Sequence, residues 1–401
     1  MRLNRQFEQI VQSPTVAATD RILALKAAGR PIIALNAGDP DFATPPEIIA
    51  AGVRALQAGW THYVPSRGLP ELRAAIAAQL AQLVDGSNGQ KPPYDPQHEI
   101  LVSHGGIHAY YLAMQSILNP GDEVLIPDPS WGTHANLVRQ LRGTVRSVPA
   151  LPEDGFLPRL TAWENALTPQ TCAIVINFPA NPTGAIPARA YLRDLLAFAQ
   201  AHDLWVVSDE VYQNLYFEQK PLSVAAFPEF RERVVLLNSL SKTYAMTGWR
   251  VGYLAAPQAL VDNALRASQN SITCVAPFVQ QAAAFALSDP AMQIAAAGMR
   301  AAYARRRQLV LDIYNQYPAG SLKLTPPQGA FYFFLDLRAL GRSSSEICER
   351  ILDEAGVGLV PGTAFGRQGE GFVRMTIAAS DEDIAAGFRA ILDWAQKAGR
   401  A

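Results

Sequence analysis

The chain has 401 residues, of which 49% are hydrophobic and 17% are charged. A single hydrophobic core stops growing at roughly 250–300 residues, so this length predicts one large domain and a second, smaller one. The 34 basic and 35 acidic side chains nearly cancel. This balance argues against nucleic-acid-binding proteins and proteins of anionic membrane surfaces, because both need a concentrated positive field.

Strand-like runs alternate with helical patterns along most of the chain, which is typical of a doubly wound α/β sheet. Helical periodicity is expected at Ile107–Leu118 and Ala188–Ala201. Uninterrupted apolar runs such as AIVINF indicate strands that are buried on both faces. The expected strands are Glu99–Ser103, Glu123–Pro127, Thr144–Val148, Cys172–Phe178, Leu204–Ser208, Val234–Asn238 and Arg250–Ala255.

The pattern changes after a long helical stretch from about Pro290 to Tyr317. Beyond it, strands at Phe331–Leu337 and Phe372–Ile377 alternate with helices at Ser344–Glu354 and Asp381–Ala398. This change predicts where the second domain lies. We predict three parts: an N-terminal arm with part of the small domain (1–46), a large domain (47–289), and a linking helix with the small C-terminal domain (290–401).

The three cysteines, Cys172, Cys274 and Cys348, are odd in number and far apart. This spacing excludes a disulfide framework, fits a reducing compartment and offers no zinc-type cluster, so we predict no metal site. Residues 1–20 lack the apolar core of a signal peptide, and no apolar run reaches the roughly 18 residues of a membrane span. We therefore expect a cytoplasmic protein.

Ligands of an open α/β sheet bind beyond the carboxyl ends of its strands. Three of the predicted strands are followed there by residues that could bind a ligand. Gly105 and Gly106 open a helix, where backbone N–H groups and the helix dipole favour a phosphate, although a glycine pair is more often only a tight turn. Asn181, between two prolines, can donate to a ligand oxygen or belong to a rigid connection. Asp209 ends a buried strand and can equally cap a helix or serve a functional role.

Lys242 stands in the most informative segment, SLSKTYAMTGWRVG. It follows a buried strand among hydroxyls and glycines, where the active site of such a sheet is expected. A partly desolvated lysine has a lowered pKa, which suits it to Schiff-base formation and proton transfer. A surface lysine is still the ordinary interpretation of any single lysine. The other lysines lie in polar or Gly/Pro-flanked stretches and are expected at the surface: Lys26, Lys91, Lys220, Lys323 and Lys397.

Ten motifs in chain order resemble one family nearly end to end. They are NAGDPDFATP from Asn36, THYVPSRGLPELRAAIA from Thr61, SHGG from Ser103, NPGDEVLIPDPSW from Asn119, NFPANPTGA from Asn177, SDEVY from Ser208, the Lys242 segment, GAFYFFLDL from Gly329, VPGTAFG from Val360 and VRMTIA from Val373. The family is the class I/II aminotransferases, pyridoxal-phosphate enzymes of fold type I that include aspartate aminotransferase. The resemblance implies a large domain with a mostly parallel seven-stranded sheet between helices, plus a smaller α+β domain.

The resemblance also implies roles for individual residues. Lys242 would bind pyridoxal 5′-phosphate as an internal aldimine and move the α-proton, and Asp209 would keep the ring nitrogen protonated. Asn181 and Tyr212 would bond the ring 3′-oxygen, and Trp131 would stack on the ring. The phosphate would meet Gly105, Gly106, Ile107, Ser239, Ser241, Arg250 and the neighbouring subunit's Tyr63, which makes a homodimer necessary.

The substrate α-carboxylate would be held by Arg374, Asn181 and the backbone of Gly38, because a guanidinium suits a carboxylate bidentately. One departure concerns the position after the glycine pair, where members that use acidic substrates have a lysine and this chain has Ile107. Ser13 matches a serine that assists that lysine. A buried carboxylate without its cation is costly, so a strict aspartate preference is doubtful and a neutral or basic amino donor fits.

The expected activity is transfer of an amino group from an L-amino acid to a 2-oxo acid. A carbon–sulfur β-lyase of the same fold is an alternative, because it uses the same lysine, aspartate, asparagine, tyrosine and arginine. A second alternative is a pyridoxal-binding transcription regulator. Such regulators carry an added N-terminal DNA-binding domain, whereas this sequence enters the catalytic motifs by Gly38 without a preceding basic region.

Overall fold

The structure, a computed structural model, describes residues 14–84, 93–318 and 320–399. Its centre is a seven-stranded sheet in the order β2-β8-β7-β6-β5-β3-β4, in which only β8 runs antiparallel to its neighbours. The seven strands expected from the sequence are all present, each within two residues of its predicted bounds. They are β2 (Ile100–Ser103), β3 (Glu123–Asp128), β4 (Thr144–Pro149), β5 (Thr171–Asn177), β6 (Trp205–Asp209), β7 (Val234–Ser239) and β8 (Gly252–Ala255).

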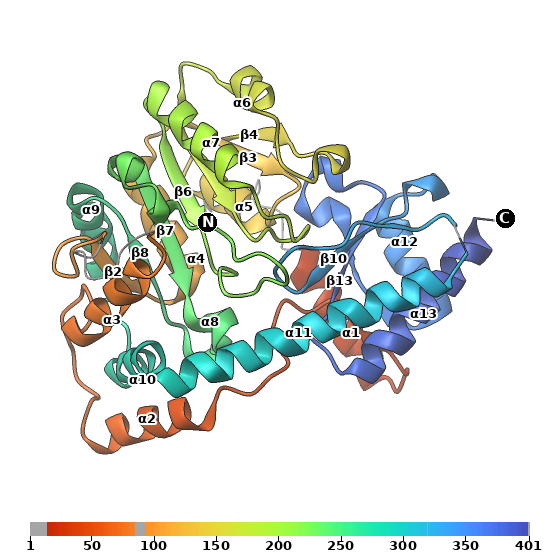
Figure 1. Cartoon of the computed structure of the whole chain (residues 1–401), viewed down its shortest axis with the longest axis horizontal. Helices are drawn as coiled ribbons and strands as arrows, with labels where there is room; N and C mark the ends of the chain where they lie inside the picture. The colour runs from red at the N-terminus through yellow and green to blue at the C-terminus, as the bar shows by residue number, and fades with distance from the viewer. Residues whose placement is uncertain (1–13, 85–92, 319, 400–401) are drawn as a thin grey trace, which may run out of the picture.

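Both faces of this sheet are covered by helices (Figure 1). Successive side chains of a strand point to opposite faces. On β5, Ala173 and Val175 pack under α4 (Gly105–Ile117), α5 (Gly132–Gln140) and α9 (Gln258–Gln269). Ile174 and Ile176 belong to the core of the other face, which is covered by α2 (Pro46–Gln57), α3 (Pro70–Ala81), α6 (Leu160–Ala166), α7 (Arg189–Ala201), α8 (Leu240–Thr243) and α10 (Pro277–Ser288).

A smaller antiparallel sheet, in the order β12-β13-β10-β9, lies in the C-terminal part of the chain. Its strands are β9 (Lys323–Leu324), β10 (Tyr332–Asp336), β12 (Val360–Pro361) and β13 (Phe372–Thr376), with α12 (Ser344–Arg350) and α13 (Asp381–Ala398) beside them. The N-terminal part of the chain joins this region: β1 (Ile33–Ala34) pairs in parallel with β11 (Val357–Gly358), and α1 (Pro14–Ala27) lies nearby.

The long helix α11 (Pro290–Gln316) connects the two regions and runs along one side of the molecule from α10 to α13 (Figure 1). Three predicted bounds were wrong. The helix expected from Ile107 begins at Gly105, directly after the strand. The strand expected from Arg250 begins at Gly252, because Arg250 has a left-handed φ of 56°. The helix expected over Ser344–Glu354 changes into a wider π-turn at Ile351–Ala355.

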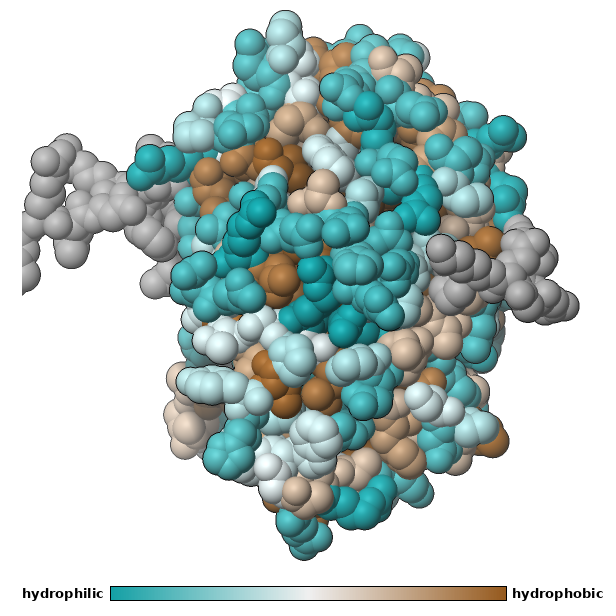
Figure 2. Space-filling view, turned by 90° about the vertical axis from the view of Figure 1, so that its left-hand side faces the viewer, coloured by the Kyte–Doolittle hydropathy of each residue, from teal (hydrophilic) through white to brown (hydrophobic). Residues whose placement is uncertain are grey.

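The face at the left of Figure 1, where α2, α3 and α9 lie, carries hydrophobic side chains in separate patches among polar ones (Figure 2). No helix in the described part of the chain is long and apolar enough to cross a membrane.

Candidate active site

A cavity of about 290 Å³ lies at the carboxyl ends of β5, β6 and β7. Most of the site residues predicted from the sequence line it, although they come from segments far apart in the chain. The exceptions are Gly105, whose neighbour Gly106 does line it, and Tyr63. The lining residues are Val16, Thr19, Gly38, Gly106, Ile107, Trp131, Asn177, Asn181, Asp209, Val211, Tyr212, Ser239, Ser241, Lys242, Thr247, Arg250, Tyr332 and Arg374.

Lys242 lies on α8, the short helix that follows β7. Its Nζ donates to the carbonyl oxygen of Gly38 at 2.6 Å. Burial lowers the pKa of Lys242 to about 8, and the positive charges of Arg374 and Arg250 act in the same direction. Near neutral pH a useful fraction of this amine is therefore unprotonated and nucleophilic. The described lysines elsewhere are exposed, namely Lys26, Lys220, Lys323 and Lys397, and Lys91 lies outside the described residues.

Asp209 is buried at the end of β6, where its two carboxylate oxygens have different partners. Oδ2 accepts from His134 Nε2 at 3.0 Å, and Oδ1 accepts from the backbone N–H of Val211 at 3.2 Å. Residues 211–214 form turns and no helix begins there, so the helix-cap interpretation of Asp209 was wrong. The side-chain amide of Asn177 donates to the Asp209 carbonyl at 2.9 Å, which also holds the strand end.

His134 is fully buried on α5, and sequence reasoning missed it. Its ring meets Trp131 edge-on, with the ring centroids 5.2 Å apart. The signal was present in the motif PSWGTH, because residues three apart on a helix share a face. A histidine bonded to a buried carboxylate holds that carboxylate in one orientation.

Gly105, Gly106, Ser239, Ser241 and Arg250 surround the N-terminus of α4, where backbone N–H groups favour an anion. Arg250 folds back over this turn, and its Nη1 and Nη2 donate to the carbonyl oxygens of Thr247 and His104 at 2.7 and 3.4 Å. Gly105 has a φ of +79°, and a Cβ there would lie 2.8 Å from Arg250 Nη2. Only glycine allows the guanidinium this approach. Ile107 follows on the same helix and is 44% exposed.

Arg374 is buried on β13 at another part of the cavity. Its Nη1 donates to Asn181 Oδ1 at 3.0 Å and its Nη2 to the Asn36 carbonyl at 2.8 Å, while its Nε has no hydrogen-bond partner among the described residues. Burial lowers the pKa of this arginine. A buried guanidinium with a free N–H is ready to donate to an anionic ligand.

Tyr332 and Tyr212 complete this end of the cavity. Their hydroxyl groups are 2.9 Å apart, and the Arg374 guanidinium lies 4.2 Å from the centre of the Tyr332 ring. Burial raises the pKa of Tyr212 well above its ordinary value, so its hydroxyl stays neutral. A Cβ at Gly38 would approach the Tyr332 hydroxyl to 2.9 Å, so glycine at this position lets the backbone of residue 38 pack closely against Tyr332. Sequence reasoning missed Tyr332 and Asn36, although both lie within recognised motifs.

Tyr63 is 86% exposed and does not line the cavity of its own chain. Ser13 lies outside the described residues. On α1, Val16 and Thr19 line the cavity, and Thr19 accepts from the Asn36 side chain at 2.9 Å.

The sequence profile of the family described as Aminotransferase class I and II matches residues 30–391. The chain belongs to this family. The aspartate aminotransferase of Pyrococcus abyssi is 38% identical over 365 residues, which cover 91% of this chain and 92% of the relative. The aspartate/prephenate aminotransferase of Thermus thermophilus is 37% identical over 400 residues, covering 100% and 99%. The arginine–pyruvate transaminase AruH of Pseudomonas aeruginosa is 36% identical over 381 residues, covering 94% of each chain.

Solved structures agree with these relatives. The aspartate aminotransferase of Thermus thermophilus with maleate superposes with a TM-score of 0.91 at 36% identity, covering 98% of this chain and 100% of the other. The fold-type-I architecture predicted from the sequence is thereby confirmed. This class I/II aminotransferase transfers amino groups between amino acids and 2-oxo acids, and the comparisons support neither the β-lyase nor the regulator.

Proposed function

We propose that this aminotransferase binds pyridoxal 5′-phosphate in the cavity, carried by Lys242. The observation that carries the proposal is the Lys242 amine, whose pKa is lowered to about 8. It shares the cavity with the buried carboxylate of Asp209 and with the anion-binding turn at the N-terminus of α4, called the anion cradle below. These groups fit the three polar parts of the cofactor: its aldehyde, its ring nitrogen and its phosphate. When bound, pyridoxal phosphate supplies an electron sink for the pair left on the substrate α-carbon after proton removal.

Asp209 and His134 act as one unit in this proposal. The Asp209 carboxylate keeps the ring nitrogen protonated, and His134 holds Oδ2 at 3.0 Å so that the charge cannot rotate away. Asn181 and Tyr212 are placed to bond the ring oxygen, and Trp131 to stack on the ring. The anion cradle of Gly105, Gly106, Ile107, Ser239, Ser241 and Arg250 takes the phosphate.

Lys242 also moves the α-proton. With the cofactor bound, Lys242 Nζ would accept the proton from the substrate α-carbon and donate it to the carbon of the cofactor's aldehyde group. A pKa of about 8 suits this work, because a base and its conjugate acid exchange most readily when the pKa lies near the working pH. The Gly38 carbonyl, 2.6 Å from Nζ, limits where the amine can point.

Arg374 receives the substrate α-carboxylate together with Asn181 and Gly38. Its Nε is a buried donor without an acceptor in the described structure, and leaving such a donor unpaired is costly. A carboxylate accepts two parallel N–H groups from a guanidinium, which fixes the orientation of the substrate as well as its affinity.

The substrate side chain is proposed to be uncharged and at least partly apolar. Val16 on α1 and Ile107 on α4 both line the cavity and are 57% and 44% exposed. Among the described residues that line it, the cations are Lys242, Arg250 and Arg374, and each already has a role above. A distal carboxylate would therefore find aliphatic side chains in this chain where it needs a cation.

A homodimer with shared sites is the final part of the proposal. On α2 and the turn after it, Ile49, Val53, Leu56 and Trp60 are 36–46% exposed, although they repeat at helical spacing as a core-facing stripe would. An apolar stripe of this kind favours burial against a second copy. The 86% exposed Tyr63 follows this stripe and would reach the partner's phosphate cradle.

A half-reaction screen tests the proposed function. Purified protein loaded with pyridoxal phosphate is mixed with each amino acid singly, and loss of the cofactor's visible absorbance is followed without any oxo acid. We expect neutral donors with apolar side chains to react faster than aspartate and glutamate. Aspartate as the fastest donor would contradict the substrate assignment, and absence of any absorbance after loading would contradict the cofactor assignment.

A further inference from the structure

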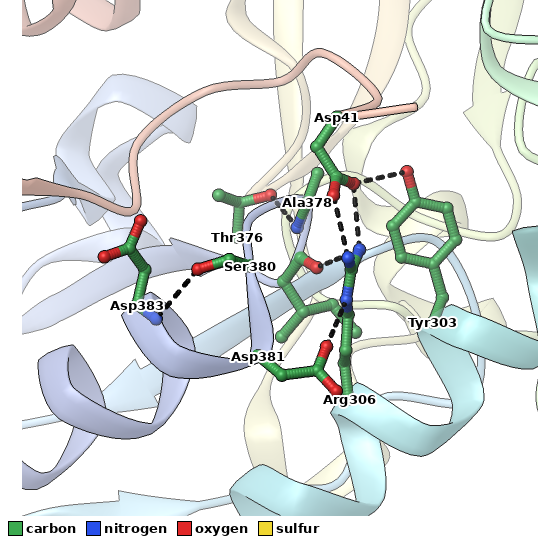
Figure 3. Close-up of polar contacts among 9 residues, drawn as sticks. Asp41, Tyr303, Arg306, Thr376, Ala378, Ser380, Asp381 and Asp383 are labelled. Atoms are coloured by element: carbon green, nitrogen blue, oxygen red, sulfur yellow. Dashed lines mark hydrogen bonds and ion pairs between the residues drawn. The ribbon is translucent and has the colours of Figure 1, made fainter. Parts of the chain in front are cut away.

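Arg306 on α11 is the centre of a polar network outside the cavity (Figure 3). Its Nη1 and Nη2 each donate to one carboxylate oxygen of Asp41 at 2.8 Å, and its Nε donates to Asp381 at 2.9 Å. Nη1 also points to the Ile377 carbonyl at 3.4 Å, and the Tyr303 hydroxyl lies 3.5 Å from Asp41. The Arg306 residue is only 7% exposed.

The two segments that this guanidinium joins both carry contacts of the active site. Asp41 lies three residues after Gly38, whose carbonyl accepts from Lys242, and five after Asn36, whose carbonyl accepts from Arg374. Ile377 lies three residues after Arg374 on the chain that leaves β13. Arg306 therefore ties the loop that presents two carbonyls to the strand that presents the substrate-binding arginine.

The loop 36–41 needs such a restraint because it has no strand or helix of its own. Two backbone bonds fix its start at Leu35, whose carbonyl accepts from the Thr376 N–H and whose N–H donates to the Gly358 carbonyl, both at 2.9 Å. Beyond Leu35 the loop has few fixed points, and the bidentate pair with Asp41 is the strongest. A carbonyl must be held to within a fraction of an ångström to keep a hydrogen bond.

We propose that Arg306 is a positioning residue: it holds loop 36–41 against β13 so that Arg374 is oriented to bind the substrate α-carboxylate. This inference rests on the proposed function, since it concerns how the same site recognises its substrate. Arg306 touches neither substrate nor cofactor. Its effect on substrate binding passes through Asp41 to the Asn36 carbonyl, and through Ile377 to Arg374.

The first test measures carboxylate affinity separately from turnover. The probe is 2-aminoisobutyrate, whose amine can join the cofactor but whose α-carbon has no hydrogen to lose, and its apparent Kd is read from the shift in cofactor absorbance. In Arg306→Gln we expect this Kd to rise about tenfold or more, while the half-reaction rate at saturating L-alanine changes by less than about threefold. Arg306→Lys, which keeps the charge but loses the fork, should rescue part of the affinity.

The matched control is Arg307→Gln. Arg307 is the next residue on α11, and its guanidinium bonds Glu218 and the Pro327 carbonyl instead of loop 36–41. Asp381→Ala removes the α13 arm of the network and leaves the Asp41 arm in place. Both variants should keep the wild-type Kd. Asp41→Asn should reproduce the Arg306→Gln effect, and the double variant should add little to it.

The second test needs no cofactor. Amide hydrogen exchange of the peptide covering 36–42 is compared in cofactor-free wild type, Arg306→Gln, Arg306→Lys and Arg307→Gln. Faster exchange in this peptide is expected for Arg306→Gln, an intermediate rate for Arg306→Lys, and no change for Arg307→Gln. Unchanged exchange together with a Kd within about twofold of wild type would overturn the inference. If wild type fails to bind pyridoxal phosphate, the proposed function fails, and the exchange test still decides the role of Arg306 in the loop.

Discussion

The pairing of buried charges fixes the positions of single residues in the cavity. Asp209 has a fixed position because His134 and Val211 hold its two oxygens. Its position at the end of a buried strand was predictable from the sequence, since ligands gather at that edge of the sheet. Its contact with His134 was not predictable, because 75 residues separate the two; the motif PSWGTH associates His134 with Trp131 and does not report the contact with Asp209.

Replacing Asp209 with alanine should leave Lys242 able to bind the cofactor but slow α-proton removal by about two to four orders of magnitude. The reason is that the ring nitrogen loses its charged partner and the electron sink weakens. Single-turnover rates with α-deuterated and ordinary donor give the size of the proton-transfer step. His134→Ala should show a smaller loss in the same step. A half-reaction rate near wild type in Asp209→Ala would mean that the carboxylate has another role.

The pKa of Lys242 predicts a pH-dependent stability of the cofactor-free protein. Its folded pKa, about 8, lies below the ordinary value of 10.5, so between these values the unfolded chain binds more protons than the folded chain. Stability from this group therefore rises with pH across that window and is lowest below about pH 8.

Lys242→Met removes this dependence. The difference in free energy of unfolding, variant minus wild type, should fall by up to about 2 kcal/mol from pH 8 to pH 10. Urea denaturation of both proteins at pH 7, 8, 9 and 10 measures it. Each should be prepared without cofactor, because bound ligand would stabilise the wild type by mass action. A difference that is flat or rising with pH would show that Lys242 is not desolvated.

Among the elements, the inner strands β5, β6 and β7 of the large sheet were the most predictable, because both of their faces are buried and each is mainly an apolar run. The sequence could not show β1, β9, β11 and β12, which are two residues long each, because two residues cannot display a period. The sequence predicted Arg250 as the start of a strand, because a single residue at an element's end cannot display a period either. Its left-handed φ of 56° is set by the turn over α4, which brings its guanidinium to Gly105, and its side-chain type gives no hint of it.

Gly105→Ala tests the anion cradle at the start of α4. The new methyl group would meet Arg250 Nη2 at 2.8 Å, and the backbone φ of +79° is unfavourable for alanine. We expect the Kd for pyridoxal phosphate to rise about tenfold or more, measured by equilibrium dialysis.

The control is Gly29→Ala, which has nearly the same φ of +82° but open space around the new methyl group. It should lose some thermal stability through backbone strain and keep the cofactor affinity. Equal losses of affinity in the two variants would indicate strain alone, and the cradle assignment would then be wrong.

At the scale of the whole molecule, the contacts that join distant segments were beyond sequence reasoning. Arg306 and Asp41 are 265 residues apart, and Arg374 and Asn36 are 338 apart. The sequence identified Arg374 through its family motif and missed Arg306, which sits in an ordinary arginine-rich helix. Only the fold distinguishes the buried Arg306 from its neighbour Arg307.

Mixing two damaged chains tests whether a dimer shares its sites. Tyr63→Phe should weaken cofactor retention, and Lys242→Ala should abolish turnover. In a hybrid dimer one site would contain both substitutions and the other site neither. Random pairing makes about half of the dimers hybrids, so the mixture should regain up to about half of the activity that one intact site in every dimer would give. Hybrid formation is checked with differently tagged chains. Hybrids that form without regaining activity would contradict the proposed role of Tyr63.

Borohydride reduction reveals which lysine carries the cofactor, because it fixes the cofactor covalently to that side chain. The protein loaded with pyridoxal phosphate is reduced with borohydride, digested and mapped by mass spectrometry. We predict a phosphopyridoxyl label on the peptide that contains Lys242 and no label in Lys242→Ala treated in the same way. A label on Lys26, Lys220 or any other lysine of the wild-type protein, with Lys242 unmodified, would contradict the account.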